Sequence, residues 1–377
     1  MSLSDQSVSR QKRILLGQLG AMGDCLYATV IARQIKHDYP DCHLTWAIGS
    51  MARSILHGNP DIDEIWEVPV ANHGEMHAAW QKFEREAIEA KERGEFDDIF
   101  LTQIFPNNFN NFDGTVRYSI FRAYPGPITV PVEPVIFLDS GEVEKVKMFA
   151  QEHRLEQGHP VILFECSSGS GQTFVSPDFA LQFSLKLIEH FPTGRVILSS
   201  HLAIPTNDER IIDGSQLTFR ENAELTKYCT LLIGGSSGVS WLCTSTWAKP
   251  LPMIQLLKKF TSVFASFVHD YEFRGADTNN IIEMTDCSSD KVLFCTSAIL
   301  AEGFEAARTK FHEQIPLNFD HYVYVMTQQK MGTVLRSAVC TVKRYGFRFL
   351  FFRSFFVIIL QEIRKLLIRL FQPHKDS

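Results

Sequence analysis

One carboxylate follows a glycine-rich turn near the start of the chain. Asp24 directly follows residues 17–23. This segment contains Gly17, Gly20 and Gly23 and comes directly after the apolar run 14–16. Glycines allow a tight turn after a buried parallel strand, and apolar residues at helical spacing predict a helix over 25–39. Asp24 is therefore expected where that helix begins. A carboxylate at this place can accept a proton from a reacting hydroxyl, or it can serve only as a helix N-cap.

A second glycine turn, in the other half of the chain, is rich in hydroxyl groups. Ser236 and Ser237 lie between Gly235 and Gly238, after an apolar run, and a helix is expected to continue to Lys249. Serine hydroxyls, backbone amides and a helix N-terminus together make an anion cradle suited to a diphosphate. A tight turn without any ligand is the alternative.

Both turns belong to a regular alternation of strands and helices, which indicates an α/β protein with doubly wound parallel sheets. We expect an N-terminal domain over residues 1–140, a second domain over 141–325 and a tail over 326–377. Strands are expected at 14–16, 44–48, 65–70, 98–103, 161–164, 195–199 and 230–235, and helices at 25–39, 77–93, 142–154, 178–190 and 221–227.

Composition limits the classes of protein to which the chain can belong. Its 377 residues are 45% hydrophobic, which suits two folded domains. A net charge of -6 argues against a nucleic-acid-binding protein. The 8 cysteines form no C-x-x-C pair and no zinc pattern, so a reducing compartment and no metal site are expected. No secretory signal is recognised, which predicts a cytoplasmic protein.

The tail has a composition of its own. Between residues 330 and 375, Lys and Arg alternate with Phe, Leu and Ile, and Glu362 is the only acidic residue. Basic charge beside an apolar face is typical of a helix that lies in a membrane interface. The alternative is that the tail packs on the body of the protein or forms an oligomer contact.

Several motifs, taken in order, resemble the glycosyltransferase family 9 group, which includes the lipopolysaccharide heptosyltransferases. They are R-I-L-L-x-x-L-G-A-x-G-D at 13–24, Y-P-D at 39–41, G-N-P-D-I-D at 58–63, the strand and serine loop before Phe174, and I-G-x-x-S-G at 233–238 before Lys249-Pro250. The D-x-D spacing within 58–63 is interpreted as turn chemistry and not as a metal site.

The resemblance implies a GT-B architecture, in which two Rossmann-like domains face each other across a cleft. It also implies an inverting glycosyltransferase that needs no metal, with a nucleotide sugar such as ADP-heptose as co-substrate and Asp24 as the catalytic base. The donor-binding residues expected are Glu165, Ser167, Ser168, Gly169, Gln172, Gly235, Ser236, Ser237, Gly238 and Trp241. The acceptor-binding residues expected are Gln18, Gly20, Met22, Gly23, Arg53, Arg117 and Arg122. Glu165 either bonds a sugar hydroxyl or caps local amides.

This chain departs from the family pattern mainly at the donor side. Gln172 stands where a lysine is common, and Ser236 and Trp241 replace a carboxylate and an imidazole; Gln18 replaces an arginine on the acceptor side. Heptose therefore remains the leading sugar only by family frequency. The alternatives are a different nucleotide sugar, or an inactive member that only binds. The expected acceptor is a lipid-linked or surface saccharide of lipopolysaccharide biosynthesis, used at the inner face of the cytoplasmic membrane.

Overall fold

The computed structural model describes residues 10–72, 74–104, 109–114, 116–166, 168, 171–259, 265–315, 322, 326–347 and 353–371. The chain forms two compact units. Unit 1 comprises Met1–Asn107 and Ile120–Phe137, and unit 2 comprises Asn108–Ser119 and Leu138–Ser377. The expected serine loop is described only in part, because Ser167 and Gly169 lie outside these ranges.

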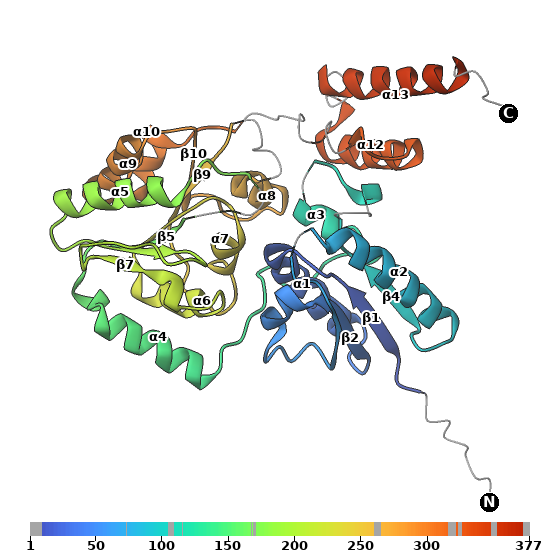
Figure 1. Ribbon diagram of the computed structural model, residues 1–377, viewed down its shortest axis with the longest axis horizontal. Coiled ribbons are helices and arrows are strands. Elements are labelled where there is room, and N and C mark those ends of the chain that lie inside the picture. The colour runs from blue at the N-terminus through green and yellow to red at the C-terminus, as the bar shows by residue number, and fades with distance from the viewer. Residues whose placement is uncertain are drawn as a thin grey trace, which may run out of the picture. The chain divides into compact units, whose positions relative to one another are not determined.

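Unit 1 contains a parallel sheet of four strands in the order β3-β2-β1-β4 (Figure 1). Leu15 of β1 packs in a cluster with Trp80 and Phe83 of α2, and Ile14 and Leu16, whose side chains alternate to the other face, are also fully buried. Both faces of the sheet are therefore covered at β1. This burial on both sides explains why β1 is an unbroken apolar run. The elements are β1 (Arg13–Gly17), α1 (Met22–Asp38), β2 (His43–Gly49), the 3₁₀ helix η1 (Ser50–Leu56), β3 (Glu64–Val68), α2 (Met76–Glu92) and β4 (Asp98–Leu101).

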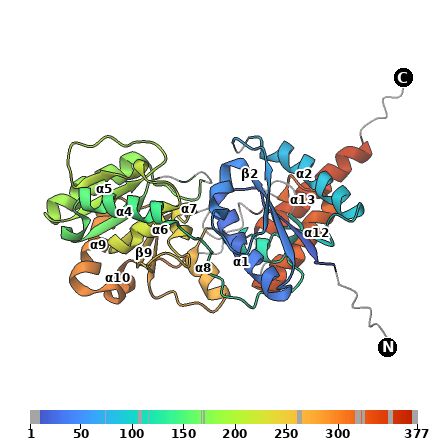
Figure 2. The ribbon, with the colours of Figure 1, turned by 90° about the horizontal axis from the view of Figure 1, so that it is seen from below.

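Unit 2 contains a parallel sheet of six strands in the order β10-β9-β8-β5-β6-β7. Its strands are β5 (Val161–Glu165), β6 (Arg195–Ser199), β7 (Ile211–Asp213), β8 (Leu231–Gly234), β9 (Met253–Leu257) and β10 (Ile281–Thr285). Its sheet helices are α4 (Ser140–Glu152), α5 (Pro177–His190), α6 (Glu221–Leu225), α7 (Gly238–Leu242), α8 (Phe267–Phe273), α9 (Ser289–Glu302) and α10 (Phe304–Phe311), with 3₁₀ turns η3 (Leu155–Gln157), η4 (Gly214–Gln216) and η5 (Thr226–Tyr228). Figures 1 and 2 show α5, α9 and α10 on one face of this sheet and α4 and α6 on the other.

In both sheets the strand order reverses beside the first strand. β1 pairs with β2 and β4, and β5 pairs with β6 and β8. The crevice at the carboxyl ends of such a strand pair is where doubly wound sheets bind ligands. We call these two places the β1/β4 switch point and the β5/β8 switch point. The predicted class, doubly wound parallel α/β units with a helical tail, is confirmed.

Several predicted boundaries differ from the structure by two or more residues, and side-chain chemistry accounts for two of them. α7 ends at Leu242 and does not continue to Lys249, because hydroxyl residues bond the local backbone there: Thr244 Oγ1 donates to Trp241 O at 2.8 Å. β4 ends at Leu101, and the side chains of Thr102 and Gln103 bond the turn after β1.

The segment 108–119 belongs to unit 2, although the sequence around it belongs to unit 1. It holds η2 (Phe109–Asn111) and the first part of α3 (Val116–Phe121). The tail helices are α12 (Met331–Tyr345) and α13 (Arg353–Phe371), also in unit 2. Within the described part of the chain, no helix combines the length and the apolar character that crossing a bilayer requires.

Candidate functional site

The turn at the β1/β4 switch point is held together by neutral side chains. Gln103 Oε1 accepts hydrogen bonds from the backbone nitrogens of Leu19 and Gly20, at 2.6 and 3.1 Å. Gln18 Oε1 accepts from the Thr102 hydroxyl at 2.8 Å, and Gln18 Nε2 donates to Gly20 O at 2.8 Å. All five residues are buried, so this network orders the backbone that leads into α1.

Asp24 lies in the first turn of α1 and is partly exposed. The N-cap of α1 is Ala21, so the alternative that Asp24 is the helix N-cap is wrong. A negative charge in the first helical turn is favoured by the helix dipole. Burial, and to a smaller extent the charge of Asp24, raises the pKa of the neighbouring Cys25 thiol well above its ordinary range. Cys25 therefore stays a neutral thiol.

The other residues expected at the acceptor side fall into three groups. Met22 and Gly23 share the partial exposure of Asp24, and Arg122 is partly exposed as well. Arg53 is exposed on η1, where its Nε lies 3.0 Å from Glu67 Oε2. Gln18 and Gly20 are buried within the turn network, so their role here is to support the turn.

Arg117 differs from all of these because it belongs to unit 2. Its guanidinium carbon lies 3.8 Å from the centre of the Trp241 ring, and Nη1 lies 2.9 Å from Asp270 Oδ2. Nη2 donates to Ser236 O at 3.3 Å, and Arg117 is only 9% exposed. A buried arginine with a carboxylate and an aromatic partner is a packing element, so Arg117 joins the segment 108–119 to the second unit.

The β5/β8 switch point is filled by a carboxylate. Glu165, the last residue of β5, is 2% exposed. Its Oε1 accepts from Val239 N at 2.8 Å, Ser237 Oγ at 2.5 Å and Ser240 N at 3.3 Å. Its Oε2 accepts from Ser240 Oγ at 2.6 Å, Gly235 N at 3.0 Å and Ser237 N at 3.4 Å. Of the two roles left open for Glu165, the structure shows the cap of local amides.

This arrangement changes what the serine turn can do. The amides and hydroxyls expected to hold a diphosphate donate instead to Glu165, so a phosphate that reaches them has to displace a buried carboxylate. Gly235 is required by packing, since a Cβ there would lie 2.6 Å from Thr173 Cβ. Gly238 and Ser237 keep partial exposure at the rim.

The remaining donor residues on this side are mostly internal. Ser236 donates its hydroxyl to Ala265 O and accepts at its carbonyl from Gln172 Nε2 at 3.0 Å. Trp241 is 2% exposed and stacks on Phe267, with ring centres 3.8 Å apart. Ser168 is the described residue of the serine loop that keeps partial exposure.

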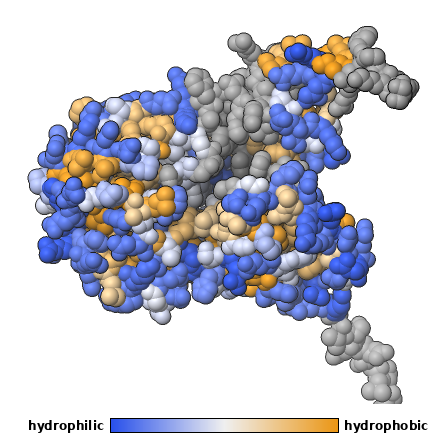
Figure 3. Space-filling view, viewed as in Figure 1, coloured by the Kyte–Doolittle hydropathy of each residue, from blue (hydrophilic) through white to orange (hydrophobic). Residues whose placement is uncertain are grey.

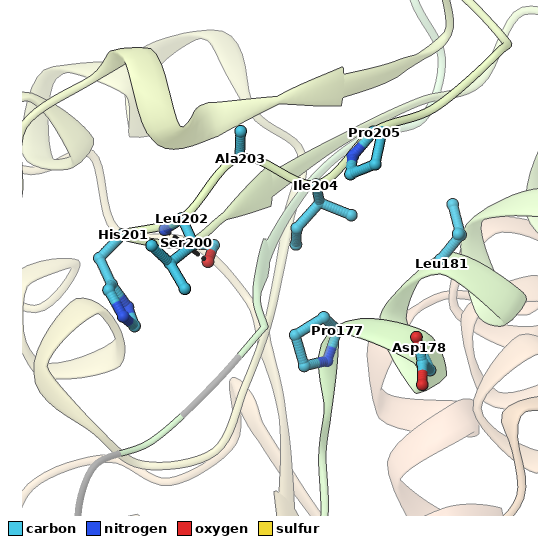
Figure 4. A pocket seen from close by; sticks show the side chains of 9 residues that line it. All are labelled: Pro177, Asp178, Leu181, Ser200, His201, Leu202, Ala203, Ile204 and Pro205. Carbon is cyan, nitrogen blue, oxygen red and sulfur yellow. Dashed lines mark hydrogen bonds between the residues drawn. The ribbon is translucent and has the colours of Figure 1, made fainter.

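A cavity of about 340 Å³ opens at the carboxyl end of β6, beside the start of α5. Figure 4 shows Leu202, Ile204 and Pro205 of the loop after β6 across from Pro177 and Leu181 of α5. Asp178, Ser200 and His201 add polar groups to this apolar wall. Small apolar cavities with a few polar groups suit a flat ring such as a nucleobase. This cavity was not predicted. Its one signal in the sequence is the pair of apolar residues Leu202 and Ile204 in the loop after β6.

Among the described residues, no three His, Cys, Asp or Glu side chains lie close enough together to hold a metal ion. In the G-N-P-D-I-D turn, Asp63 Oδ2 lies 2.5 Å from Lys36 Nζ and accepts from Leu44 N at 2.6 Å. Asp61 N donates to Asn59 Oδ1 at 2.9 Å. These contacts make the carboxylate of Asp63 and the backbone of Asp61 part of the turn.

Comparison with known proteins finds similarity in structure but not in sequence. No protein-family model matches the chain, and no curated protein matches its sequence. Among solved structures, a family 9 glycosyltransferase from Veillonella parvula is 13% identical, with 88% of this chain and 98% of that chain covered and a TM-score of 0.49.

Two Escherichia coli structures are similar at the same level. The ADP-heptose lipopolysaccharide heptosyltransferase II is 14% identical over 78% of this chain and 99% of its own, with a TM-score of 0.49. The heptosyltransferase WaaC with ADP is 14% identical over the same shares, with a TM-score of 0.43. The similar structures thus include proteins of the glycosyltransferase family 9 group that the motifs resemble, at 13–14% identity.

Proposed function

We propose that this protein is an inverting glycosyltransferase that moves a sugar, with heptose favoured, from a nucleotide sugar to a lipopolysaccharide or other surface-glycan acceptor without a required metal. Asp24 takes the proton of the acceptor hydroxyl as that oxygen attacks the anomeric carbon. The bond from the anomeric carbon to the phosphate oxygen breaks in the same step, and the nucleoside diphosphate leaves.

The observation that carries this proposal is the position of Asp24. It lies beyond the carboxyl end of β1, beside a switch point whose backbone donors are satisfied by the neutral Gln103. Because Gln103 is neutral, the acceptor of these backbone donors adds no charge to the turn, and we assign the uptake of the proton to the carboxylate of Asp24. The family-like motif at 13–24 supports the same role.

We assign the binding of the nucleotide-sugar donor to unit 2. The nucleobase is placed in the cavity between the loop after β6 and the start of α5, and Ser168, Ser237 and Gly238 at the adjoining strand ends face the sugar and phosphates. The charge that develops on the leaving diphosphate needs donors that are already oriented. Displacement of Glu165 from the amides of Gly235 and Val239 is one source of such donors.

One observation favours the second candidate, a binding protein without turnover. The groups expected to hold the diphosphate are used by Glu165, and Gln172, which stands in place of a lysine, is buried against Ser236. A charged hydrogen bond to phosphate, worth about 1.5–3 kcal/mol, is missing at that place. The two candidates differ in turnover and not in binding.

A panel of nucleotide sugars with ADP, UDP, GDP and CMP carriers separates these functions. Binding is measured by titration calorimetry, and transfer to lipopolysaccharide-core acceptors by mass spectrometry, with and without EDTA. We expect one donor to bind and to be transferred in both conditions. Failure of every donor to bind contradicts both functions, whereas binding with no transfer to any acceptor supports the binding protein. Transfer that EDTA abolishes contradicts the metal-independent mechanism.

Asp24→Asn and Asp24→Ala test the base in the same assay. We expect both variants to bind the donor as the wild type does and to lose transfer. Asp41→Asn, at an exposed carboxylate after the end of α1, is the matched control and should keep full transfer. Transfer that survives in both Asp24 variants removes Asp24 from the role of base.

We further propose that the protein acts in the cytoplasm, on a lipid-linked acceptor at the inner face of the cytoplasmic membrane. The basic and apolar composition of residues 330–375 supports this placement.

A further inference from the structure

The tail helix α13 presents its apolar side to solvent. Seven of its hydrophobic side chains are between 40% and 65% exposed, which is unusual for a helix of a globular protein. They are Phe356, Ile359, Leu360, Ile363, Leu366, Leu367 and Ile368. Figure 3 shows hydrophobic surface beside hydrophilic surface over this helix.

Most of these side chains form one stripe. Phe356, Leu360, Ile363 and Leu367 follow one another at intervals of four, three and four residues, the spacing that places side chains on one face of an α-helix. The apolar face is therefore continuous along the described side chains of α13.

The opposite, polar side of α13 faces the protein. Glu362 is 7% exposed, and Lys365 Nζ lies 2.5 Å from Glu362 Oε1 and donates to Thr327 O at 2.5 Å. An amphipathic helix on a protein surface normally does the reverse, with its apolar side toward the core. The inversion leaves the apolar stripe available to a partner.

Helix α12 repeats this orientation. Ser337 and Thr341 are fully buried, and the Ser337 hydroxyl donates to Phe112 O. Met331, Leu335 and Val339, four residues apart, are 40%, 60% and 55% exposed. Beside these hydroxyl residues, Val334 is the buried apolar side chain of α12. Two consecutive helices thus turn mainly hydroxyl or charged groups inward and carry large apolar side chains on the exposed side.

The exposed charges around these stripes are positive. Arg336 and Lys343 of α12 and Arg364 of α13 are exposed, and Glu362, the only acidic residue between 330 and 375, is neutralised by Lys365. A second copy of this chain would bring like charges together, which opposes association. An anionic lipid surface offers both an apolar layer and negative charge at its border.

We propose that α12 and α13 bind the surface of an anionic lipid bilayer, with α13 lying in the plane of the interface and its Phe356–Leu360–Ile363–Leu367 stripe among the acyl chains. The basic side chains contact the lipid headgroups. This inference deepens the membrane placement given above, but it does not depend on which reaction the chain catalyses.

Vesicle co-sedimentation of the full-length chain tests the proposal. The vesicles are made of phosphatidylcholine alone, or of three parts phosphatidylcholine to one part phosphatidylglycerol. We expect binding to the anionic vesicles, at least tenfold weaker binding to the neutral ones, and a decrease as salt is added. A wild-type chain that does not bind the anionic vesicles overturns the proposal.

The variant Leu360→Ser/Leu367→Ser tests the face itself. Both side chains are exposed, so the fold is retained, which an unchanged melting temperature verifies, and the partition into anionic vesicles should fall by about tenfold or more. The matched control is Met148→Ser/Phe294→Ser, at two exposed apolar side chains on α4 and α9, and should bind as the wild type does.

Two outcomes of this test contradict the proposal. Equal vesicle binding by the wild type and the stripe variant shows that another surface binds lipid. A wild type that is dimeric by light scattering in the absence of lipid, and a stripe variant that is monomeric, shows that the stripe is a protein–protein interface. Arg336→Gln/Arg364→Gln adds a third readout, since it should weaken binding to the anionic vesicles and leave binding to the neutral ones unchanged.

Discussion

The two switch points of this protein have the same backbone plan and opposite electrostatics. At β1/β4, the turn amides donate to the side-chain carbonyl of Gln103, and the carboxylate, Asp24, stays partly exposed in the first turn of the following helix. At β5/β8, the turn amides donate to the carboxylate of Glu165, which is buried. The turn after β1 is thus held by a neutral acceptor, whereas the turn after β8 is held mainly by a charged one.

Because of this difference, we expect Asp24 to be able to react and Glu165 to support the fold. Glu165 accepts hydrogen bonds from backbone and hydroxyl donors at both oxygens, so it cannot take a proton from a substrate without first losing a donor. Asp24 keeps access to solvent. The location at a sheet's carboxyl end is therefore not enough to identify a catalytic carboxylate, and its burial has to be considered as well.

The most direct test of this difference removes the charge of Asp24 or of Glu165 and measures both turnover and stability. Asp24→Asn should lower the rate of transfer about 10²–10⁴-fold, the usual contribution of a positioned base. Its free energy of unfolding should change by less than about 1 kcal/mol, because the side chain is partly exposed in a first helical turn. Steady-state rates and urea unfolding measure the two effects, and a large loss of stability would give Asp24 a structural role.

Glu165→Ala should show the opposite pattern. It leaves the buried donors of Gly235, Ser237, Val239 and Ser240 without an acceptor, so we expect a loss of about 3–5 kcal/mol in the free energy of unfolding. Urea unfolding followed by circular dichroism measures it, with Glu189→Ala at an exposed carboxylate of α5 as the control. A loss below about 1 kcal/mol would mean that water or another group replaces the carboxylate.

Another buried carboxylate, Glu283 of β10, gives a test of this comparison through pH. It is 1% exposed and accepts from Ser266 Oγ and Val268 N. Burial raises its pKa to about 7, against the opposing effect of these hydrogen bonds. The pKa of Glu283 in the folded protein thus lies above that of an unfolded glutamate, about 4.3. The contribution of Glu283 to stability is therefore complete below pH 4.3 and is lost as pH rises through 7.

Raising the pH from below 4.3 to above 7 therefore lowers the contribution of Glu283 to the free energy of unfolding by about 4 kcal/mol. Glu283→Gln should therefore have a flatter stability profile than the wild type when urea unfolding is repeated from pH 5 to pH 8. Parallel profiles for the two proteins would show that Glu283 is not the source of this pH dependence.

The smallest effect is expected at the neutral partner of the first switch point. Gln103→Leu removes the acceptor of Leu19 N and Gly20 N, so the free energy of unfolding should fall by about 1–3 kcal/mol. Transfer should fall as well, since the turn that places Asp24 loses its support. Urea unfolding and transfer rates measure both, and an unchanged protein would show that water can take the place of Gln103.

The sequence by itself determined the elements and their class. Apolar runs, glycine turns and helical spacing predicted most strands and helices of the two sheets within a few residues, because these signals are local. It also determined that a carboxylate follows the turn after the first strand, and that the tail is basic and apolar. It did not separate the roles of Asp24 and Glu165, since each is simply an acid after a strand.

Only the tertiary structure decided those roles. The donors to Glu165 lie 70 to 75 residues further along the chain, and the partner of Arg117 lies 153 residues away. The direction of the α13 stripe depends on the contact between Lys365 and Thr327, 38 residues apart. No local pattern records which distant group fills a turn or which side of an amphipathic helix meets the protein, because both depend on how the finished sheets and helices pack.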